Sequence, residues 1–124
     1  MIFNKIKVGI INMNCNNLYS IFNSCQNIGY KTSVIKNSKN LRAFDIIILP
    51  GVGSFKQAIK YLKNNNFDKE ILNFLQLKNK GILGICLGMQ LFFESSEEFG
   101  FTKGLEILEG KVKTLAKKIK KAIK

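Results

Sequence analysis

A cysteine between two glycines is the part of this sequence best suited to chemistry. Gly84, Ile85, Cys86, Leu87 and Gly88 form a Gly-x-Cys-x-Gly motif between an apolar run and a helical one. A sharp turn from strand to helix leaves no room for side chains two residues either side of a nucleophile, which explains both glycines. Backbone N–H groups at the start of the helix, that of Leu87 foremost, favour a thiolate and can bind an oxyanion. The motif therefore predicts a nucleophilic thiol that attacks a carbonyl carbon.

A second glycine-rich turn favours this interpretation over a structural one. Taken alone, a cysteine that ends an apolar strand is more often a small buried hydrophobe than a nucleophile. Residues 50–55 have the sequence PGVGSF and end another apolar run, so Gly51, Val52 and Gly53 offer further backbone amides. Both turns are expected at the carboxyl edge of a parallel sheet, where ligands bind. Two such turns, one with a cysteine, suit acyl transfer through a thioester.

Apolar runs alternate with helical periodicities along the chain. This order predicts an α/β fold in which a mostly parallel sheet lies between two layers of helices, a three-layer sandwich. The expected strands, the second near an edge and the third central, cover residues 6–11, 31–36, 44–49 and 81–86. The expected helices cover residues 17–28, about 55–62, about 67–75 and the segment after Cys86 through Phe93. Residues 105–108 and 111–115 are expected to form a terminal β-hairpin or a strand with a tight turn.

The composition fits one globular domain and argues against several other classes. The chain has 124 residues, of which 46% are hydrophobic. With three cysteines, no CxxC pair and no histidine, we expect neither a metal nor a cofactor. Cys15 and Cys25 are interpreted as structural. No apolar stretch approaches the ~20 residues of a membrane span and no signal pattern is present, so the expected location is the cytoplasm.

The positive charge is concentrated at one end of the chain. The net charge is +12, and seven of the 20 basic residues lie within residues 111–124, which hold no acid. Such a segment can attract nucleic acid or an anionic membrane. However, no recognition helix or stacking aromatics accompany it. We therefore expect neither nucleic acid nor a membrane as partner, and we interpret residues 116–124 as a disordered or frayed basic tail.

Three segments carry a family resemblance. PGVGSF, GICLGMQLFFESSEEFG and GLEILEGKV follow one another in the order and spacing of class I glutamine amidotransferases. Within that family the chain is most similar to the glutaminase subunits of imidazole glycerol phosphate synthases. The resemblance covers roughly residues 5–115. It implies the family's three-layer α/β fold and the hydrolysis of glutamine to glutamate, with the ammonia passing to a cyclase subunit that is a (β/α)₈ barrel, in histidine biosynthesis.

The resemblance also assigns roles to residues of this chain. It implies that Cys86 is the catalytic nucleophile and that Leu87 and the backbone of residues 51–53 supply the oxyanion hole. It implies further that Gln90 helps to hold the substrate glutamine. No metal site and no cofactor are implied.

The loop after the first strand departs from the family pattern. The family usually has an Asp-Tyr-Gly-x-Gly-Asn run there, whereas residues 12–17 have the sequence NMNCNN and only Asn17 matches cleanly. In the family this loop faces the partner subunit. The departure leaves open an amidotransferase that serves another synthase, such as one that makes surface sugars.

The second departure concerns the catalytic base. The family's triad is completed by a histidine and a glutamate far downstream of the cysteine, and this chain contains no histidine. The resemblance therefore predicts impaired catalysis, or a non-catalytic remnant. Glu94, Glu97 and Glu98 are interpreted as a solvated helix end, not as substitutes. The lysine-rich string after Leu115 is typical of an A-rich gene read out of frame. We interpret residues 1–115 as a partial amidotransferase domain, incomplete at the C-terminus and cut by a frameshift or a short reading frame.

Overall fold

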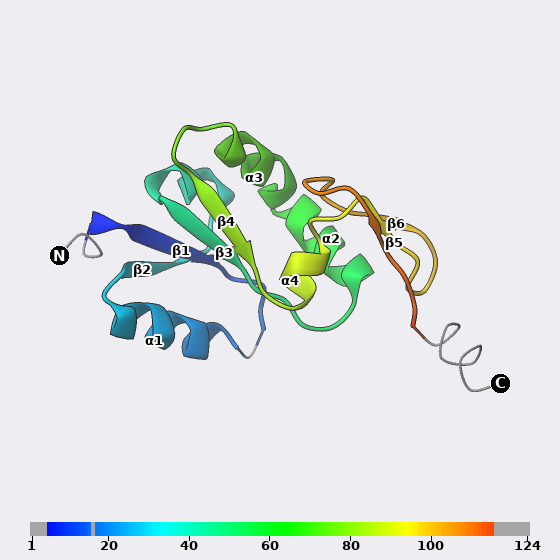
Figure 1. The fold of residues 1–124 in the computed structure, drawn as a ribbon, viewed down its shortest axis with the longest axis horizontal. Helices are drawn as coiled ribbons and strands as arrows, with labels where there is room; N and C mark the ends of the chain where they lie inside the picture. Colours follow the sequence, from blue (N-terminus) through cyan, green and yellow to red (C-terminus); the bar gives the residue numbers. More distant parts are fainter. Residues whose placement is uncertain (1–4, 16, 116–124) are drawn as a thin grey trace.

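A parallel β-sheet forms the centre of the molecule. The computed structural model describes residues 5–15 and 17–115. Its four-stranded sheet has the order β2-β1-β3-β4, and all neighbouring strands run parallel. The strands are β1 (Lys7–Ile11), β2 (Lys31–Ile35), β3 (Ile46–Leu49) and β4 (Gly81–Gly84). The predicted parallel sheet is confirmed, with the second strand at an edge and the third inside (Figure 1).

Helices cover both faces of this sheet and give the three predicted layers. One face carries α1, and the other carries η2, α2 and α3 (Figure 1). Their bounds are α1 (Leu18–Ile28), η2 (Ser38–Ala43), α2 (Phe55–Asn64) and α3 (Phe67–Leu75). Alternate residues of a strand point to opposite faces. Ile48 therefore joins the cluster under α1, while Ile47 and Leu49 join the larger core under α2 and α3.

Local sequence signals set the ends of these helices. α1 stops before Gly29, whose φ of 109° is left-handed and whose N–H donates to the Gln26 carbonyl at 3.0 Å. α2 starts after Ser54, whose Oγ accepts a hydrogen bond of 3.1 Å from the Gln57 N–H. The helices predicted for these two segments are confirmed, the first to within one residue of its predicted start.

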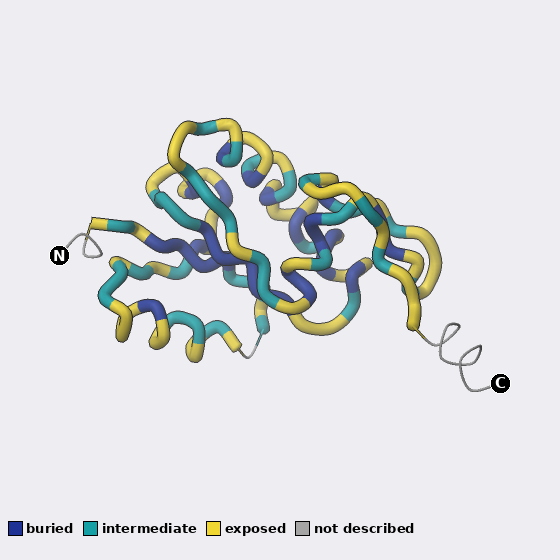
Figure 2. The backbone as a smooth tube through the Cα atoms, in the orientation of Figure 1, coloured by how far each residue is buried: buried dark blue, intermediate teal, exposed yellow. Residues whose placement is uncertain are grey.

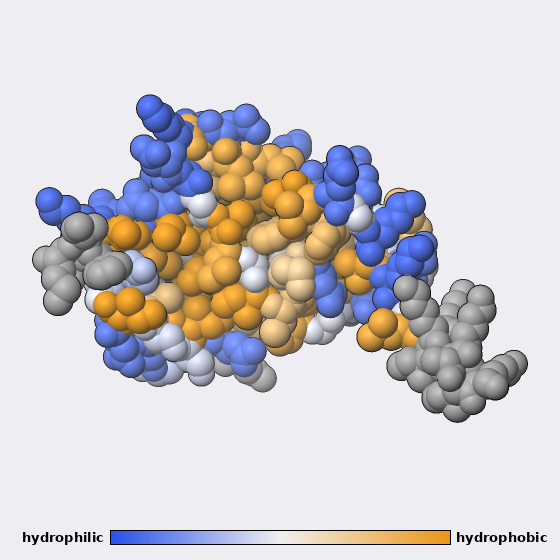
Figure 3. Space-filling view, viewed as in Figure 1, coloured by the Kyte–Doolittle hydropathy of each residue, from blue (hydrophilic) through white to orange (hydrophobic). Residues whose placement is uncertain are grey.

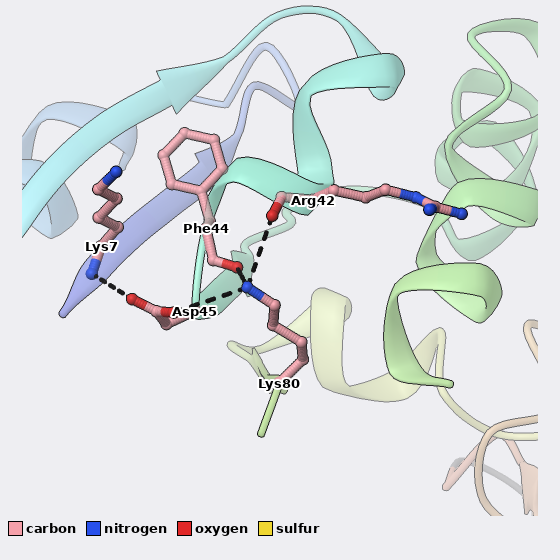
Figure 4. A network of polar contacts seen from close by, with 5 residues as sticks. All are labelled: Lys7, Arg42, Phe44, Asp45 and Lys80. Carbon is pink, nitrogen blue, oxygen red and sulfur yellow. Dashed lines mark hydrogen bonds and ion pairs between the residues drawn. The ribbon is translucent and has the colours of Figure 1, made fainter. Parts of the chain in front are cut away.

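A polar network joins three strands at the amino edge of the sheet (Figure 4). The Lys7 N–H donates to Asp45 Oδ2 at 2.9 Å, and Asp45 Oδ1 lies 3.6 Å from Lys80 Nζ. The Lys80 ammonium also donates to the carbonyls of Phe44 at 2.6 Å and Arg42 at 3.5 Å. The hydrogen bond from Lys7, aided by the charge of Lys80, holds the pKa of Asp45 below its ordinary value. The network fixes the starts of β1, β3 and β4 relative to one another.

β4 lies at the edge of the sheet, and this corrects the prediction of a buried strand over residues 81–86. Leu83 is 52% exposed, and Gly81 and Ile82 are half-buried (Figure 2). Leu83 is in register with Ile48 and so points to the α1 side of the sheet. Figure 3 shows an apolar stretch across the middle of the face seen in the view of Figure 1, where β4 lies in front. The prediction was wrong because, within residues 5–15 and 17–115, β4 has a strand neighbour on one side only.

The segment after Cys86 differs most from the prediction. The expected helix through Phe93 ends at Gln90, because the N–H groups of Phe92 and Phe93 donate to carbonyls three residues earlier instead of four. The carbonyls of residues 91–93 accept hydrogen bonds from the N–H groups of residues 105–108. The elements here are α4 (Leu87–Gln90), β5 (Ser95–Ser96), β6 (Thr102–Lys103) and β7 (Lys111–Val112). The three strands form a second, small sheet of order β6-β5-β7. Of the two alternatives predicted here, the terminal hairpin is wrong, because residues 105–108 form no strand and β7 pairs in parallel with β5. A strand is present in this region as β7.

Part of the sequence prediction falls beyond these elements. Residues 116–124, the predicted basic tail, lie outside the described residues. The domain boundary at residue 115 stays a prediction. Across residues 5–15 and 17–115, no helix combines the length and the apolar character needed to cross a membrane.

Candidate active site

Cys86 occupies a strained turn between β4 and α4. Its backbone has φ 52° and ψ −120°, a conformation that costs a residue with a side chain about 1–3 kcal/mol. The Ile85 N–H donates to the Leu49 carbonyl at 3.0 Å, which extends the pairing of β4 with β3 to the residue before the cysteine. The Gly88 N–H then donates to the Ile85 carbonyl at 2.9 Å and closes the turn. The predicted change from strand to helix at Cys86 is thus present.

Both glycines of the motif are required by close packing. A Cβ atom at Gly84 would lie 2.6 Å from the Met89 Cα and 2.7 Å from the Phe92 ring. A Cβ atom at Gly88 would overlap the carbonyl of Leu49 at the end of β3. Atoms cannot approach so closely without displacement of the backbone. The steric reason given for the two glycines is therefore confirmed.

The second glycine-rich turn lies directly against the cysteine turn. A Cβ atom at Gly51 would be 3.0 Å from the Gly88 nitrogen and 3.2 Å from the Leu87 Cβ. Gly53 has a φ of 95°, and Val52 is 55% exposed. The structure therefore brings together the two turns that the sequence placed at one edge of the sheet. We call residues Gly51, Val52 and Gly53 the 51–53 turn.

Four backbone N–H groups of the two turns make no hydrogen bond within the described part of the chain. Among the described residues, none accepts a hydrogen bond from the N–H groups of Gly51, Val52, Gly53 or Leu87. Val52 and Gly53 are exposed, whereas Gly51 and Leu87 are buried. Their assignment as an oxyanion hole stays a prediction, as does the role of Cys86 as nucleophile.

The other predicted residues differ in their surroundings. Gln90 is half-buried, and its N–H donates to the Cys86 carbonyl at 3.3 Å. Cys86 is exposed, Cys15 is half-buried and Cys25 is buried. Burial raises the pKa of the Cys25 thiol, and this lowers the fraction of reactive thiolate at Cys25. Cys25 packs with Ile10 in the core under α1, as its predicted structural role requires.

The prediction of a solvated helix end after α4 is confirmed for the exposure of Glu94 and Glu97 and wrong for the helix, which ends earlier at Gln90. Glu94 follows the end of the helix, and its Oε2 accepts a hydrogen bond of 3.1 Å from the Gly110 N–H. The Glu98 N–H donates to the Ser96 Oγ at 3.1 Å. Both residues therefore take part in the connections of the small sheet. The expectation that they do not replace the catalytic base stays a prediction. Among the described residues, no cluster of three or more His, Cys, Asp or Glu could hold a metal ion.

Sequence reasoning missed a hollow beside the 51–53 turn. Its volume is about 230 Å³, and its lining residues come from the loop after β1, the turn after β3 and α2. They are Met13, Asn14, Gly51, Val52, Ser54, Gln57, Ala58 and Tyr61. Ser54 could have been found as a helix N-cap that directly follows the glycine-rich turn. Tyr61 carries no local signal, because its contact partner is 49 residues away.

A strand, a cysteine with positive φ and a short helix, set against a glycine-rich turn, define an α/β protein of the nucleophile-elbow type. The family model described as "Glutamine amidotransferase class-I" matches residues 10–123. The chain therefore belongs to the class I glutamine amidotransferase family.

Named relatives support a particular branch of this family. The chain is 44% identical over 105 residues to imidazole glycerol phosphate synthase subunit HisH of Wolinella succinogenes, covering 85% of this chain and 51% of that protein. It is 42% identical over 118 residues to the subunit HisH of Prochlorococcus marinus, covering 95% and 54%. The fold matches a crystal structure of a glutamine amidotransferase with a TM-score of 0.73 at 16% identity, over 88% of this chain and 57% of that one. The chain spans about half the length of the curated relatives it matches.

Proposed function

We propose that the chain is the cysteine-bearing part of a glutaminase subunit that supplies ammonia to an imidazole glycerol phosphate synthase in histidine biosynthesis. The observation that carries this proposal is the exposed Cys86 thiol, held at a positive φ beside four unbonded backbone N–H groups. The relatives at 42–44% identity are subunits of that synthase, which supports the choice of pathway.

The geometry suits acylation of the thiol by glutamine. The Cys86 Sγ attacks the side-chain amide carbon of glutamine, and the carbonyl oxygen becomes an oxyanion. The N–H of Leu87 and those of the 51–53 turn donate to that oxygen, a type of stabilisation that typically changes rates by ~10²–10³ per donor. The C–N bond then breaks, and the thiol proton leaves with the nitrogen as ammonia. Gln90 holds the glutamine, and the product on the protein is a glutamyl thioester.

Release of glutamate needs a water molecule to attack that thioester. Water adds its oxygen to the acyl carbon, and its proton returns to the sulfur, which yields glutamate and free Cys86. The sequence contains no histidine to move these protons. Loss of a positioned base reduces such rates by orders of magnitude. We therefore propose that this chain by itself acylates slowly and turns over poorly.

The proposed partner is a cyclase subunit with a (β/α)₈ barrel, bound as a heterodimer in the cytoplasm. Support comes from the relatives, which are subunits of a larger synthase. No metal and no cofactor are part of the proposal.

A second candidate function follows from the loop after β1. Asn12, Met13 and Asn14 replace the usual family residues there. The alternative is therefore an amidotransferase for a synthase of surface sugars, with the same chemistry at Cys86. Co-purification separates the two candidate functions. The chain is tested for binding to a cyclase subunit of imidazole glycerol phosphate synthase and, in parallel, to a sugar-modifying synthase. Binding to the sugar-modifying synthase alone contradicts the role in histidine biosynthesis.

The acylation step can be tested directly by intact mass. Purified chain is incubated with L-glutamine and quenched in acid, which preserves a thioester. We expect a mass gain of one glutamyl group, mapped to Cys86 and absent from Cys86→Ala. Cys15→Ser and Cys25→Ser are matched controls and should acylate like the parent chain. Absence of the adduct, with and without a barrel partner, would leave only the non-catalytic remnant.

A further inference from the structure

Asn12 organises the loop between β1 and α1 through three hydrogen bonds. Its N–H donates to the Ile35 carbonyl at 3.1 Å and so extends the pairing of β1 with β2. Its Oδ1 accepts from the Asn14 N–H at 3.0 Å, and Asn14 has a left-handed φ of 55°. Its carbonyl oxygen accepts from the Tyr61 hydroxyl at 2.6 Å. We call residues Asn12, Met13 and Asn14 the 12–14 loop.

Tyr61 brings the third of these bonds from a distant and rigid element. It lies on α2, which is anchored in the core by Phe55, Ile59 and Leu62, each at most 4% exposed. α2 begins directly after the 51–53 turn, and Ser54 caps its first turn. A group held on α2 is therefore held in a fixed position relative to that turn.

The 12–14 loop and the 51–53 turn form two walls of one hollow. Met13 and Asn14 line it on one side, Gly51 and Val52 line it on the other, and Tyr61 also faces it. Met13 is partly buried and packs against the core, but an apolar contact does not fix the orientation of the loop. Within the described residues, the Tyr61 hydroxyl makes the one hydrogen bond between α2 and the 12–14 loop.

We propose that Tyr61 is a positioning residue that holds the 12–14 loop against α2 and thereby keeps the 51–53 turn in place for its oxygen-binding role. This inference rests on the proposed function of Cys86 and the 51–53 turn. Without the hydroxyl, the loop loses its directional link to α2, and the hollow can change its width. The N–H groups of the 51–53 turn are then less often placed to donate hydrogen bonds to the substrate carbonyl oxygen.

The test compares Tyr61→Phe with Tyr19→Phe in the full chain. Both changes remove one hydroxyl, but Tyr19 is 75% exposed on α1 and serves as the matched control. The probe is the chloromethyl ketone analogue of L-glutamine, whose chloride the Cys86 sulfur displaces. Its inactivation kinetics give a binding constant and a maximal rate separately. Iodoacetamide, which needs no oxygen-binding turn, reports the reactivity of the thiol alone.

For Tyr61→Phe we expect the maximal rate with the chloromethyl ketone to fall about fivefold, the ratio expected for loss of one neutral hydrogen bond. The binding constant and the iodoacetamide rate should stay within about twofold of the parent, and Tyr19→Phe should match the parent throughout. Hydrogen exchange should become faster at the Asn12 and Asn14 amides and remain unchanged in β3.

Three results would overturn the inference. An unchanged maximal rate in Tyr61→Phe, with saturation in the parent, refutes the positioning role and leaves the proposed function intact. Faster exchange throughout β1 and β3 would show a general loss of stability instead of a local one. Absence of saturation in the parent chain refutes the proposed function, and the inference falls with it.

Discussion

Replacement of Gly88 by alanine tests whether close packing of two backbones holds the cysteine turn. The new Cβ atom would lie 2.7 Å from the Leu49 carbonyl carbon and nearer still to its oxygen. The obstruction is backbone, so no side chain can rotate away and either β3 or the turn must move. Overpacking typically costs about 1–3 kcal/mol, and a clash with backbone belongs at or above the upper end. We expect the free energy of unfolding to fall by about 3 kcal/mol.

Gly81→Ala, at the start of β4, is the matched control. A Cβ atom at Gly81 meets no atom within 4 Å, and its φ is not left-handed. The change should therefore be neutral, or stabilise by up to about 1 kcal/mol through the unfolded chain. Urea unfolding followed by circular dichroism measures both variants, and a loss of about 3 kcal/mol moves the midpoint by roughly 1–3 M. A Gly88→Ala midpoint within error of that of Gly81→Ala would refute the packing argument.

Three further predictions concern stability, each checked by urea unfolding. Leu62→Ala, at a fully buried site, should lose about 2–5 kcal/mol, whereas Leu72→Ala, 42% exposed, should lose far less; equal losses would contradict the described core. Ser54→Ala removes the N-cap of α2 and should lose about 1 kcal/mol, and Ser24→Ala, which removes only a bond to the carbonyl four residues earlier, should be near neutral. Because the folded pKa of Asp45 is lowered, its contribution is present above the ordinary value of about 4 and is lost as pH falls through the folded value. Asp45→Asn should therefore lose at most about 1 kcal/mol at pH 7, since the side chain is 44% exposed, and about nothing near pH 2; a loss that grew toward low pH would contradict this sign.

The features that could be predicted from sequence are those set by neighbouring residues. Gly29 marks the end of α1 because glycine adopts its left-handed φ without strain. Gly84 and Gly88 mark the cysteine turn because the crowding arises within a few residues and from one adjacent strand. The apolar run of β3 predicts its internal position correctly, because both faces of β3 are covered by the core.

The features that could not be predicted depend on contacts between distant residues. Phe92 and Phe93 have helical spacing with Met89, yet the Phe92 carbonyl accepts from the N–H groups of Ile107 and Leu108, both at 2.8 Å. A carbonyl used in this way is not available to extend a helix past residue 95, and the N–H groups of Phe92 and Phe93 already donate three residues back instead of four. The same hydrogen bonds remove residues 105–108 from the expected hairpin. Nothing in the local sequence shows that these two segments meet, and the bond from Tyr61 to Asn12 was missed for the same reason.

The strain at Cys86 shows which part of the proposed chemistry this chain holds by itself. A φ of 52° persists only when surrounding contacts enforce it. Those contacts are the packing of Gly84 on the Phe92 ring, that of Gly88 on the Leu49 carbonyl, and the bond from Ile85 to Leu49. All of them lie within the described residues, as do the four unbonded N–H groups. Placement of the Cys86 turn and of these N–H groups therefore does not depend on a histidine, whereas the proposed proton transfer does. Formation of the proposed thioester and its hydrolysis should respond separately to mutation, the first to changes at these glycines and the second to the supply of a catalytic base.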